Sequence, residues 1–289
     1  MPKIFYYMLL AVPLGLFFKF NHQEIPMFFA ACVAIIPLAA IMGHATENLA
    51  VYMGEKAGGL INASFGNATE LLITFFALRA GLFDVVKASI AGSILGNILL
   101  VLGLAILAGG IKNGEQTFDR VHTSNQTSLM FLSIIALVIP AFFFSSPQQS
   151  HALDEFSLVV AGILLLIYLA GLFFSIRRNG SPGTQAEGHK GWSKPLALSA
   201  LAVSTVLIAL ESELLVSGIE PVTEFLGWSQ FFIGIIIIPV IGNAAEHFTA
   251  VQMAWKNRTD LAFEIAIGSS TQIALLVTPA LVFVSFIIG

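Results

Sequence analysis

The chain has few charged residues and a single cysteine, and both shortages limit what it can be. Only 10% of its 289 residues are Asp, Glu, Lys or Arg, whereas a soluble globular domain carries about 25%. With a mean hydropathy of +0.89, the composition is that of an integral membrane protein. Cys32 has no partner for an internal disulfide, and one cysteine builds no metal or redox motif. A net charge of −4 favours no nucleic-acid partner.

Motifs of common enzymes are also missing. The sequence contains no HExxH zinc motif, no GxSxG nucleophile turn and no phosphate-binding glycine loop. Hydrolysis needs a nucleophile beside a base, and nothing in the sequence pairs the two. We therefore expect a protein that is not an enzyme and that uses no cofactor.

Long apolar runs fill most of the sequence and predict membrane-spanning helices. The first run could be read as a signal peptide, but no small-residue cleavage site follows it, so we interpret it as a transmembrane helix. The most polar connection lies at residues 177–194 and separates two halves. The nine predicted spans are 4–20, 26–50, 58–80, 83–109, 127–146, 155–176, 195–217, 229–255 and 261–288.

The distribution of Lys and Arg predicts the orientation. If the spans alternate, ten of the 13 basic residues fall on one side, while Lys19, Arg79 and Lys87 fall on the other. Because cytoplasmic loops are enriched in Lys and Arg, we expect the N-terminus and the 177–194 connection to be cytoplasmic.

A pentapeptide, GNATE at 66–70, recurs as GNAAE at 242–246. Residues 66–100 align without gaps on 242–276, and their nine identities include Gly, Asn, Glu, Asp and Ser as well as apolar residues. A fainter match joins 46–49 to 212–215, with about ten extra residues between it and the second pentapeptide. The two copies lie five spans apart. This odd number places them in opposite orientations, as in an inverted repeat.

These observations predict an all-α integral membrane protein with an N-terminal helix and two inverted five-helix repeats. We expect the N-terminal transmembrane helix at 1–25, the first repeat at 26–176, a cytoplasmic loop at 177–194 and the second repeat at 195–289. Nine spans leave the second repeat two C-terminal helices short of the first.

Each pentapeptide places a glutamate inside an apolar stretch. A carboxylate at bilayer depth is costly and usually faces a cavity or an ion path. The preceding Gly-Asn interrupts the helix, and the freed carbonyls can coordinate a cation. Ca²⁺ takes about six to eight oxygens, and Glu70 and Glu246 together offer two carboxylates that balance its charge. Carboxylates buried close together hold a cation or protons, but not both well, which suggests exchange.

Other polar residues near the repeats are candidates for supporting roles. Neutral oxygens could come from Asn67, Asn243, Ser93, Asn97, Ser269 and Gln272. Proton tuning or gating could involve His247, Glu47, Glu211 and Glu213. Structural interpretations stay open. Glu70 and Glu246 could form hydrogen bonds between packed helices, the other three glutamates could lie at helix ends beside an aqueous vestibule, and the glycines could permit close packing.

These motifs resemble those of the calcium/proton exchanger (CAX) family within the cation/Ca²⁺ exchanger superfamily. GNATELLITFFAL (66–78) and PVIGNAAEHFTAV (239–251) are similar to its two signatures. VVKASIAGSILGN (85–97) and IAIGSSTQIALLV (265–277) are similar to the helices that follow them. The resemblance implies antiport of Ca²⁺ and H⁺ by alternating access, with Glu70 and Glu246 as the metal- and proton-binding residues. It also implies two further C-terminal helices and permits a homotrimer.

Two other functions stay open at this point, a Na⁺-driven Ca²⁺ exchanger and a cation channel. Mn²⁺ or Cd²⁺ could replace Ca²⁺ as the substrate, since all three accept carboxylate oxygens. Eukaryotic relatives often carry an acidic helix between the halves, whereas the 177–194 loop contains a single acidic residue. The resemblance therefore favours a prokaryotic plasma membrane, or a vacuolar membrane if the chain is eukaryotic.

Overall fold

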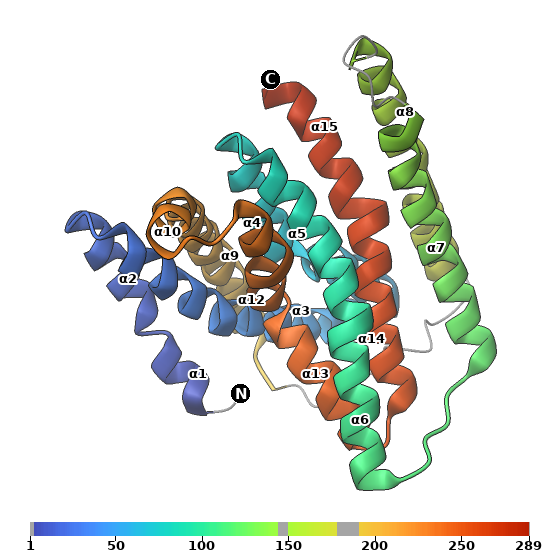
Figure 1. Ribbon diagram of the computed structural model, residues 1–289. Coiled ribbons are helices and arrows are strands. Elements are labelled where there is room, and N and C mark those ends of the chain that lie inside the picture. The colour runs from blue at the N-terminus through green and yellow to red at the C-terminus, as the bar shows by residue number, and fades with distance from the viewer. Residues whose placement is uncertain (1–2, 144–149, 178–190, 289) are drawn as a thin grey trace. The chain divides into compact units, whose positions relative to one another are not determined.

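A computed structural model describes residues 3–143, 150–177 and 191–288, and every regular element within these ranges is a helix (Figure 1). The elements of the first half of the sequence are α1 (Lys3–Met8), α2 (Ala11–Phe20), α3 (Glu24–Phe65), α4 (Ala68–Arg79), α5 (Phe83–Leu95), the π-helix η1 (Gly96–Val101), α6 (Leu102–Asn113), α7 (Arg120–Phe143) and α8 (Ser150–Arg177). Those of the second half are α9 (Lys194–Ser217), α10 (Ile219–Leu226), α11 (Gln230–Phe232), the π-helix η3 (Ile233–Ile237), α12 (Ile238–Gly242), α13 (Ala244–Trp255), α14 (Thr259–Gln272), the π-helix η4 (Ile273–Val277) and α15 (Thr278–Ile288).

Length and composition make seven of the described helices, or eight if one broken pair counts as a single span, able to cross a membrane. The predicted break between the spans 26–50 and 58–80 is wrong, because α3 continues through it as one helix of 42 residues. The sequence there, VYMGEKA, contains no proline, and its Glu-Lys pair consists of good helix formers. Polarity suggested a loop where helix propensity is high.

The described residues form two compact units, and each unit draws on both halves of the sequence. Unit 1 comprises Met1–Ser93 and Asn179–Ala245, and unit 2 comprises Ile94–Arg178 and Glu246–Gly289. The boundaries of these units therefore differ from those of the predicted repeats. Most of the predicted loop at 177–194, namely 178–190, lies outside the described residues.

Unit 1 is built around the pairing of α3 with α9, against which α2 and α4 also pack. Leu38, Met42 and Leu49 of α3 meet Leu201 and Ile208 of α9 in a buried apolar cluster. Within a membrane such contacts stabilise by close packing, because lipid is as apolar as the side chains. This packing fixes α4, the helix that carries Glu70.

Unit 2 is built around α14, η4 and α15, which α7 and α8 cover on one side. The helix α6 and the π-helix η1 also pack against α14. Gln116 links these elements, because its Nε2 donates to the Ile106 carbonyl (3.0 Å) and its Oε1 accepts from the Thr259 hydroxyl (2.8 Å). These contacts hold α14, which carries Ser269.

Two of the π-helices occupy equivalent positions in the sequence repeat. Residues 96–101 of η1 align with 272–277, and η4 covers 273–277. The other π-helix of the described residues, η3, aligns with residues of α3 that are α-helical. The two matched π-helices directly follow α5 and α14, the helices that carry Gly92-Ser93 and Gly268-Ser269. π-Helices are uncommon and are frequently found at functional sites.

Candidate ion-binding site

Each pentapeptide breaks its helix at the asparagine, as predicted. Asn67 (φ −109°, ψ 23°) and Asn243 (φ −94°, ψ 7°) have similar non-helical backbones, and α4 and α13 begin at the next residue. Glu70 and Glu246 are consequently the third residue of their helices. The amino end of a helix carries partial positive charge, which lowers the cost of an ionised carboxylate there. The repeated sequence thus produces a repeated local structure.

In unit 1, Glu70 is buried against the second pentapeptide. Only 3% of the residue is exposed. A methyl group added to Gly242 would lie 3.3 Å from Oε1 of Glu70 and 3.5 Å from its Cγ. The absence of a side chain at Gly242 therefore provides the space in which the carboxylate lies.

Asn243 connects the second pentapeptide to α5, which carries Ser93. Its Nδ2 donates to the Ser93 hydroxyl at 3.3 Å and to the Pro239 carbonyl at 3.1 Å. The residue is fully buried, and its Oδ1 has no hydrogen-bond partner within the part of the chain that the structure describes. A buried acceptor of this kind needs a partner, and a bound cation would supply one.

In unit 2, Glu246 and His247 are held by the residues that follow the two pentapeptides. The Ser269 hydroxyl hydrogen-bonds to the Glu246 carboxylate, and Oε2 of Glu246 is buried with no partner among the described residues. Nε2 of His247 lies 3.1 Å from Oδ1 of Asn97, a distance at which a protonated Nε2 donates to the amide oxygen. Asn97 is 1% exposed and is the second residue of η1. Four of the predicted residues of unit 2 therefore contact a predicted partner.

Two further predicted ligands lie directly before a helix. Asn67 is buried at the start of α4, and Gln272 is half-buried at the end of α14. Asn67 lies at the helix break, and Gln272 lies directly before η4.

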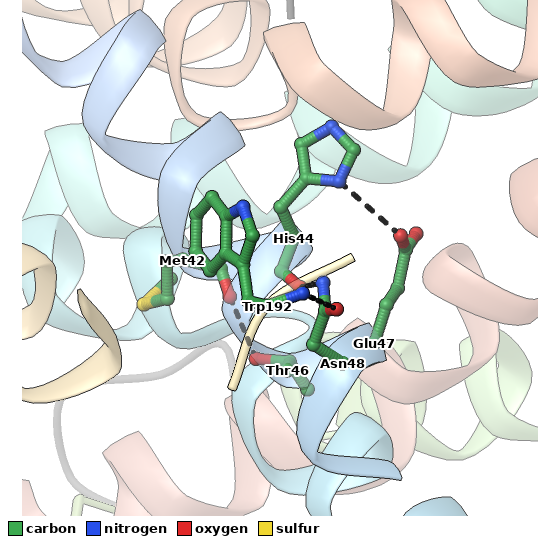
Figure 2. A network of polar contacts seen from close by, with 6 residues as sticks. All are labelled: Met42, His44, Thr46, Glu47, Asn48 and Trp192. Carbon is green, nitrogen blue, oxygen red and sulfur yellow. Dashed lines mark hydrogen bonds and ion pairs between the residues drawn. The ribbon is translucent and has the colours of Figure 1, made fainter. Parts of the chain in front are cut away.

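The three glutamates predicted for proton tuning or gating differ in their surroundings. Glu47 is exposed, and its Oε2 lies 3.5 Å from Nδ1 of His44 (Figure 2). Glu213 is exposed as well. Glu211 is 1% exposed and faces α2, where a methyl group on Gly15 would lie 3.1 Å from its Oε2. Of the three, Glu211 alone is a buried acid.

Beside Glu47, the residue Trp192 attaches the start of the second half to α3. Its backbone N–H donates to Oδ1 of Asn48 at 3.0 Å, and its carbonyl accepts from the Tyr52 hydroxyl at 2.8 Å. Figure 2 shows the indole lying between Met42 and His44, whose ring centroid is 6.4 Å from that of Trp192. No pattern in the sequence predicts this contact, because Trp192 is separated from Asn48 by 144 residues.

Within the described ranges, no three His, Cys, Asp or Glu side chains gather as a metal-binding group. A cation bound here would therefore take amide, hydroxyl and carbonyl oxygens in addition to carboxylates. Sequence reasoning missed two buried hydroxyls, Ser89 and Ser212, which have no hydrogen-bond partner among the described residues. A signal existed for both, since Ser89 lies one helical turn before Ser93 and Ser212 lies between two glutamates.

Known proteins match this chain over almost its whole length. The model of the sodium/calcium exchanger protein family matches residues 24–177 and 196–288. A Ca²⁺/H⁺ antiporter of Aphanothece halophytica is 43% identical over 99% of this chain and 82% of its own length. The Ca²⁺/H⁺ antiporter ChaA of Bacillus subtilis (strain 168) is 42% identical over 99% of this chain and 84% of its own. The structure of native YfkE is similar to this chain with a TM-score of 0.85 and 40% sequence identity. The match covers 98% of this chain and 82% of the YfkE chain.

Proposed function

The chain belongs to the sodium/calcium exchanger family, in its calcium/proton exchanger branch, and we propose that it exchanges Ca²⁺ for H⁺ across a membrane. The observation that carries this proposal is the agreement along 99% of the chain with relatives named as Ca²⁺/H⁺ antiporters. The two glutamates at repeated helix breaks support it, because antiport needs groups that bind either a cation or protons.

We further propose that Glu70 and Glu246 are the residues that carry the exchanged ions. Each lies at the amino end of a short helix; Glu70 is buried, and Glu246 is half-buried with a buried Oε2. A carboxylate there is either protonated or ionised with a cation, so the two ligands exclude each other. Two carboxylates balance one Ca²⁺ or two protons, which gives two protons per Ca²⁺ as the simplest ratio.

The neutral residues have separate proposed roles. Asn243 offers its unpartnered Oδ1 as a ligand, while Ser93 orients its amide. Ser269 orients the Glu246 carboxylate, and Asn97 orients the ring of His247. Asn67 and Gln272 are proposed as further oxygen donors.

Several broader features are part of the same proposal. The protein acts as a transporter and not as an enzyme, uses no cofactor, and takes Ca²⁺ as its substrate, with Mn²⁺ or Cd²⁺ as alternative ions. Its N-terminus is cytoplasmic in a prokaryotic plasma membrane, as the Lys and Arg distribution predicts. A homotrimer is the proposed assembly, by resemblance to the family.

Uptake of Ca²⁺ into proteoliposomes under an imposed pH gradient tests the function. Wild-type protein should take up Ca²⁺ when the gradient is present and lose uptake when an ionophore removes it. Glu70→Gln and Glu246→Gln keep the shape of the side chain but remove its charge, so each should reduce uptake to that of empty vesicles. Glu220→Gln, at an exposed position on α10, is the matched control and should transport normally.

The alternatives give different outcomes in the same assay. Uptake driven by Na⁺ and indifferent to pH would indicate a Na⁺-driven exchanger. Ca²⁺ flux down its own gradient, with no coupled ion, would indicate a channel. Normal uptake by both glutamine variants would disprove the assigned role of the glutamates and leave the antiport proposal in place.

A further inference from the structure

The start of α7 forms a shallow groove on the surface of unit 2. Its volume is about 600 Å³, and the lining runs from Phe118 and Arg120 past four Ser and Thr side chains at positions 123–128 to Phe131 and Leu132. Phe118 stacks on Phe263 of α14 with ring centroids 4.7 Å apart, which fixes that end of the groove. Apart from the Phe118 ring, the groove is therefore polar at one end and apolar at the other.

This change of polarity follows the depth of a membrane. The apolar part of α7 that could span a bilayer is Thr123–Pro140, so Arg120 lies just before it. Leu132 is twelve residues further on, about 18 Å along the helix axis. Since the hydrocarbon core is about 30 Å thick, the arginine lies at headgroup depth when Phe131 and Leu132 lie among acyl chains.

The polar end has donors that are free for a ligand. Arg120 is exposed, and no carboxylate among the described residues forms an ion pair with it. The neighbouring Asp119 accepts the Val121 N–H instead, and its own N–H donates to Oδ1 of Asp260. Ser124 and Ser128 are exposed in the first two turns of the span, where lipid tails cannot accept their hydrogen bonds.

We propose that this groove binds one anionic phospholipid. The phosphate pairs with Arg120, the glycerol and ester oxygens accept from Ser124 and Ser128, and one acyl chain lies over Phe131 and Leu132. Charge complementarity and the polarity gradient both point to this occupant, because inorganic phosphate would leave the apolar end uncovered. The inference is independent of ion exchange, since none of these residues belongs to the proposed ion-binding set.

The test is native mass spectrometry of the purified full chain from mixed micelles of phosphatidylglycerol and phosphatidylcholine. Wild-type protein should retain one phosphatidylglycerol in preference to phosphatidylcholine. Arg120→Gln should weaken this retention about fivefold, the effect of one basic side chain at an anionic surface. Arg258→Gln removes an exposed arginine outside the groove and should retain lipid as the wild type does.

A second variant separates lipid from other occupants. Ser128→Leu fills the groove but keeps the arginine, so it should also lose the bound lipid, while thermal unfolding in detergent reports whether each variant is folded. The proposal is overturned if Arg120→Gln and the wild type retain phosphatidylglycerol equally. It is equally overturned if excess inorganic phosphate displaces the lipid signal, or if the variant lowers the oligomeric mass, which would assign the groove to a second copy of the chain.

Discussion

The carboxylate of Glu70, from the first pentapeptide, lies against the α-carbon of Gly242, the glycine of the second. A methyl group at Gly242 would be 3.3 Å from Oε1 of Glu70, closer than most side-chain contacts. Residues 172 positions apart in one sequence thus determine the environment of a single acid. The close approach explains why the pentapeptide needs glycine at this position and leads to the first prediction.

Gly242→Ala should displace the Glu70 carboxylate by a few tenths of an ångström and reduce Ca²⁺ uptake without unfolding the protein. Overpacking of this size costs about 1 kcal/mol, which corresponds to about a fivefold change in apparent Ca²⁺ affinity. The measurement is uptake as a function of Ca²⁺ concentration. Gly43→Ala is the control, because a methyl group there would meet nothing within 4 Å.

The equivalent serines of the two repeats should differ in their effect on transport. Ser269→Ala removes a hydrogen bond to the Glu246 carboxylate, whereas Ser93→Ala removes one between neutral groups, from the Asn243 amide. Hydrogen bonds to charged groups are worth about 1.5–3 kcal/mol and neutral ones about 0.5–1.5. Uptake kinetics should therefore show the larger loss for Ser269→Ala, and equal losses would contradict the assigned contacts.

The matched glycines of the Gly-Ser pairs should differ in their effect on stability. A methyl group on Gly92 would lie 2.7 Å from the backbone carbonyl carbon of Ile235, and one on Gly268 would meet nothing within 4 Å. We expect Gly92→Ala to lower the free energy of unfolding by about 2 kcal/mol or more. Gly268→Ala should be neutral or stabilising, since alanine favours the helix. Thermal unfolding in detergent measures both, and a destabilised Gly268→Ala would refute the assignment.

Asn48→Ala should loosen the attachment of Trp192 to α3. The backbone N–H of Trp192 loses its acceptor, and a single hydrogen bond of about 1 kcal/mol corresponds to about fivefold faster amide exchange. Hydrogen exchange of the peptide that contains Trp192 reports this directly. Asn113→Ala removes a side chain that donates to the Ala254 and Trp255 carbonyls of unit 2, so it should leave the Trp192 amide unchanged.

The sequence predicted the parts of the fold that depend on local chemistry. The family, the all-helical membrane architecture and the breaks at Asn67 and Asn243 are confirmed, because hydropathy, repetition and Gly-Asn chemistry are visible along the chain. The continuation of α3 past residue 50 was predicted wrongly, since polar helix formers were taken for a loop. The contact of Trp192 with Asn48 depends on packing between distant segments, which no local pattern encodes. The roles assigned to the site residues stay predictions that the transport assays test.

The π-helices also bear on the direction of the side chains behind each glutamate. A π-helix bonds residue i to residue i+5, so it widens the helix and rotates the residues after it relative to those before it. Because η1 and η4 fall at the same place in a gap-free alignment, both copies change the phase of the helix at the same point. The residues that align with η3 in the first copy are α-helical, so this third change of phase has no counterpart there. The repeat therefore preserves a change of helix phase in addition to a sequence.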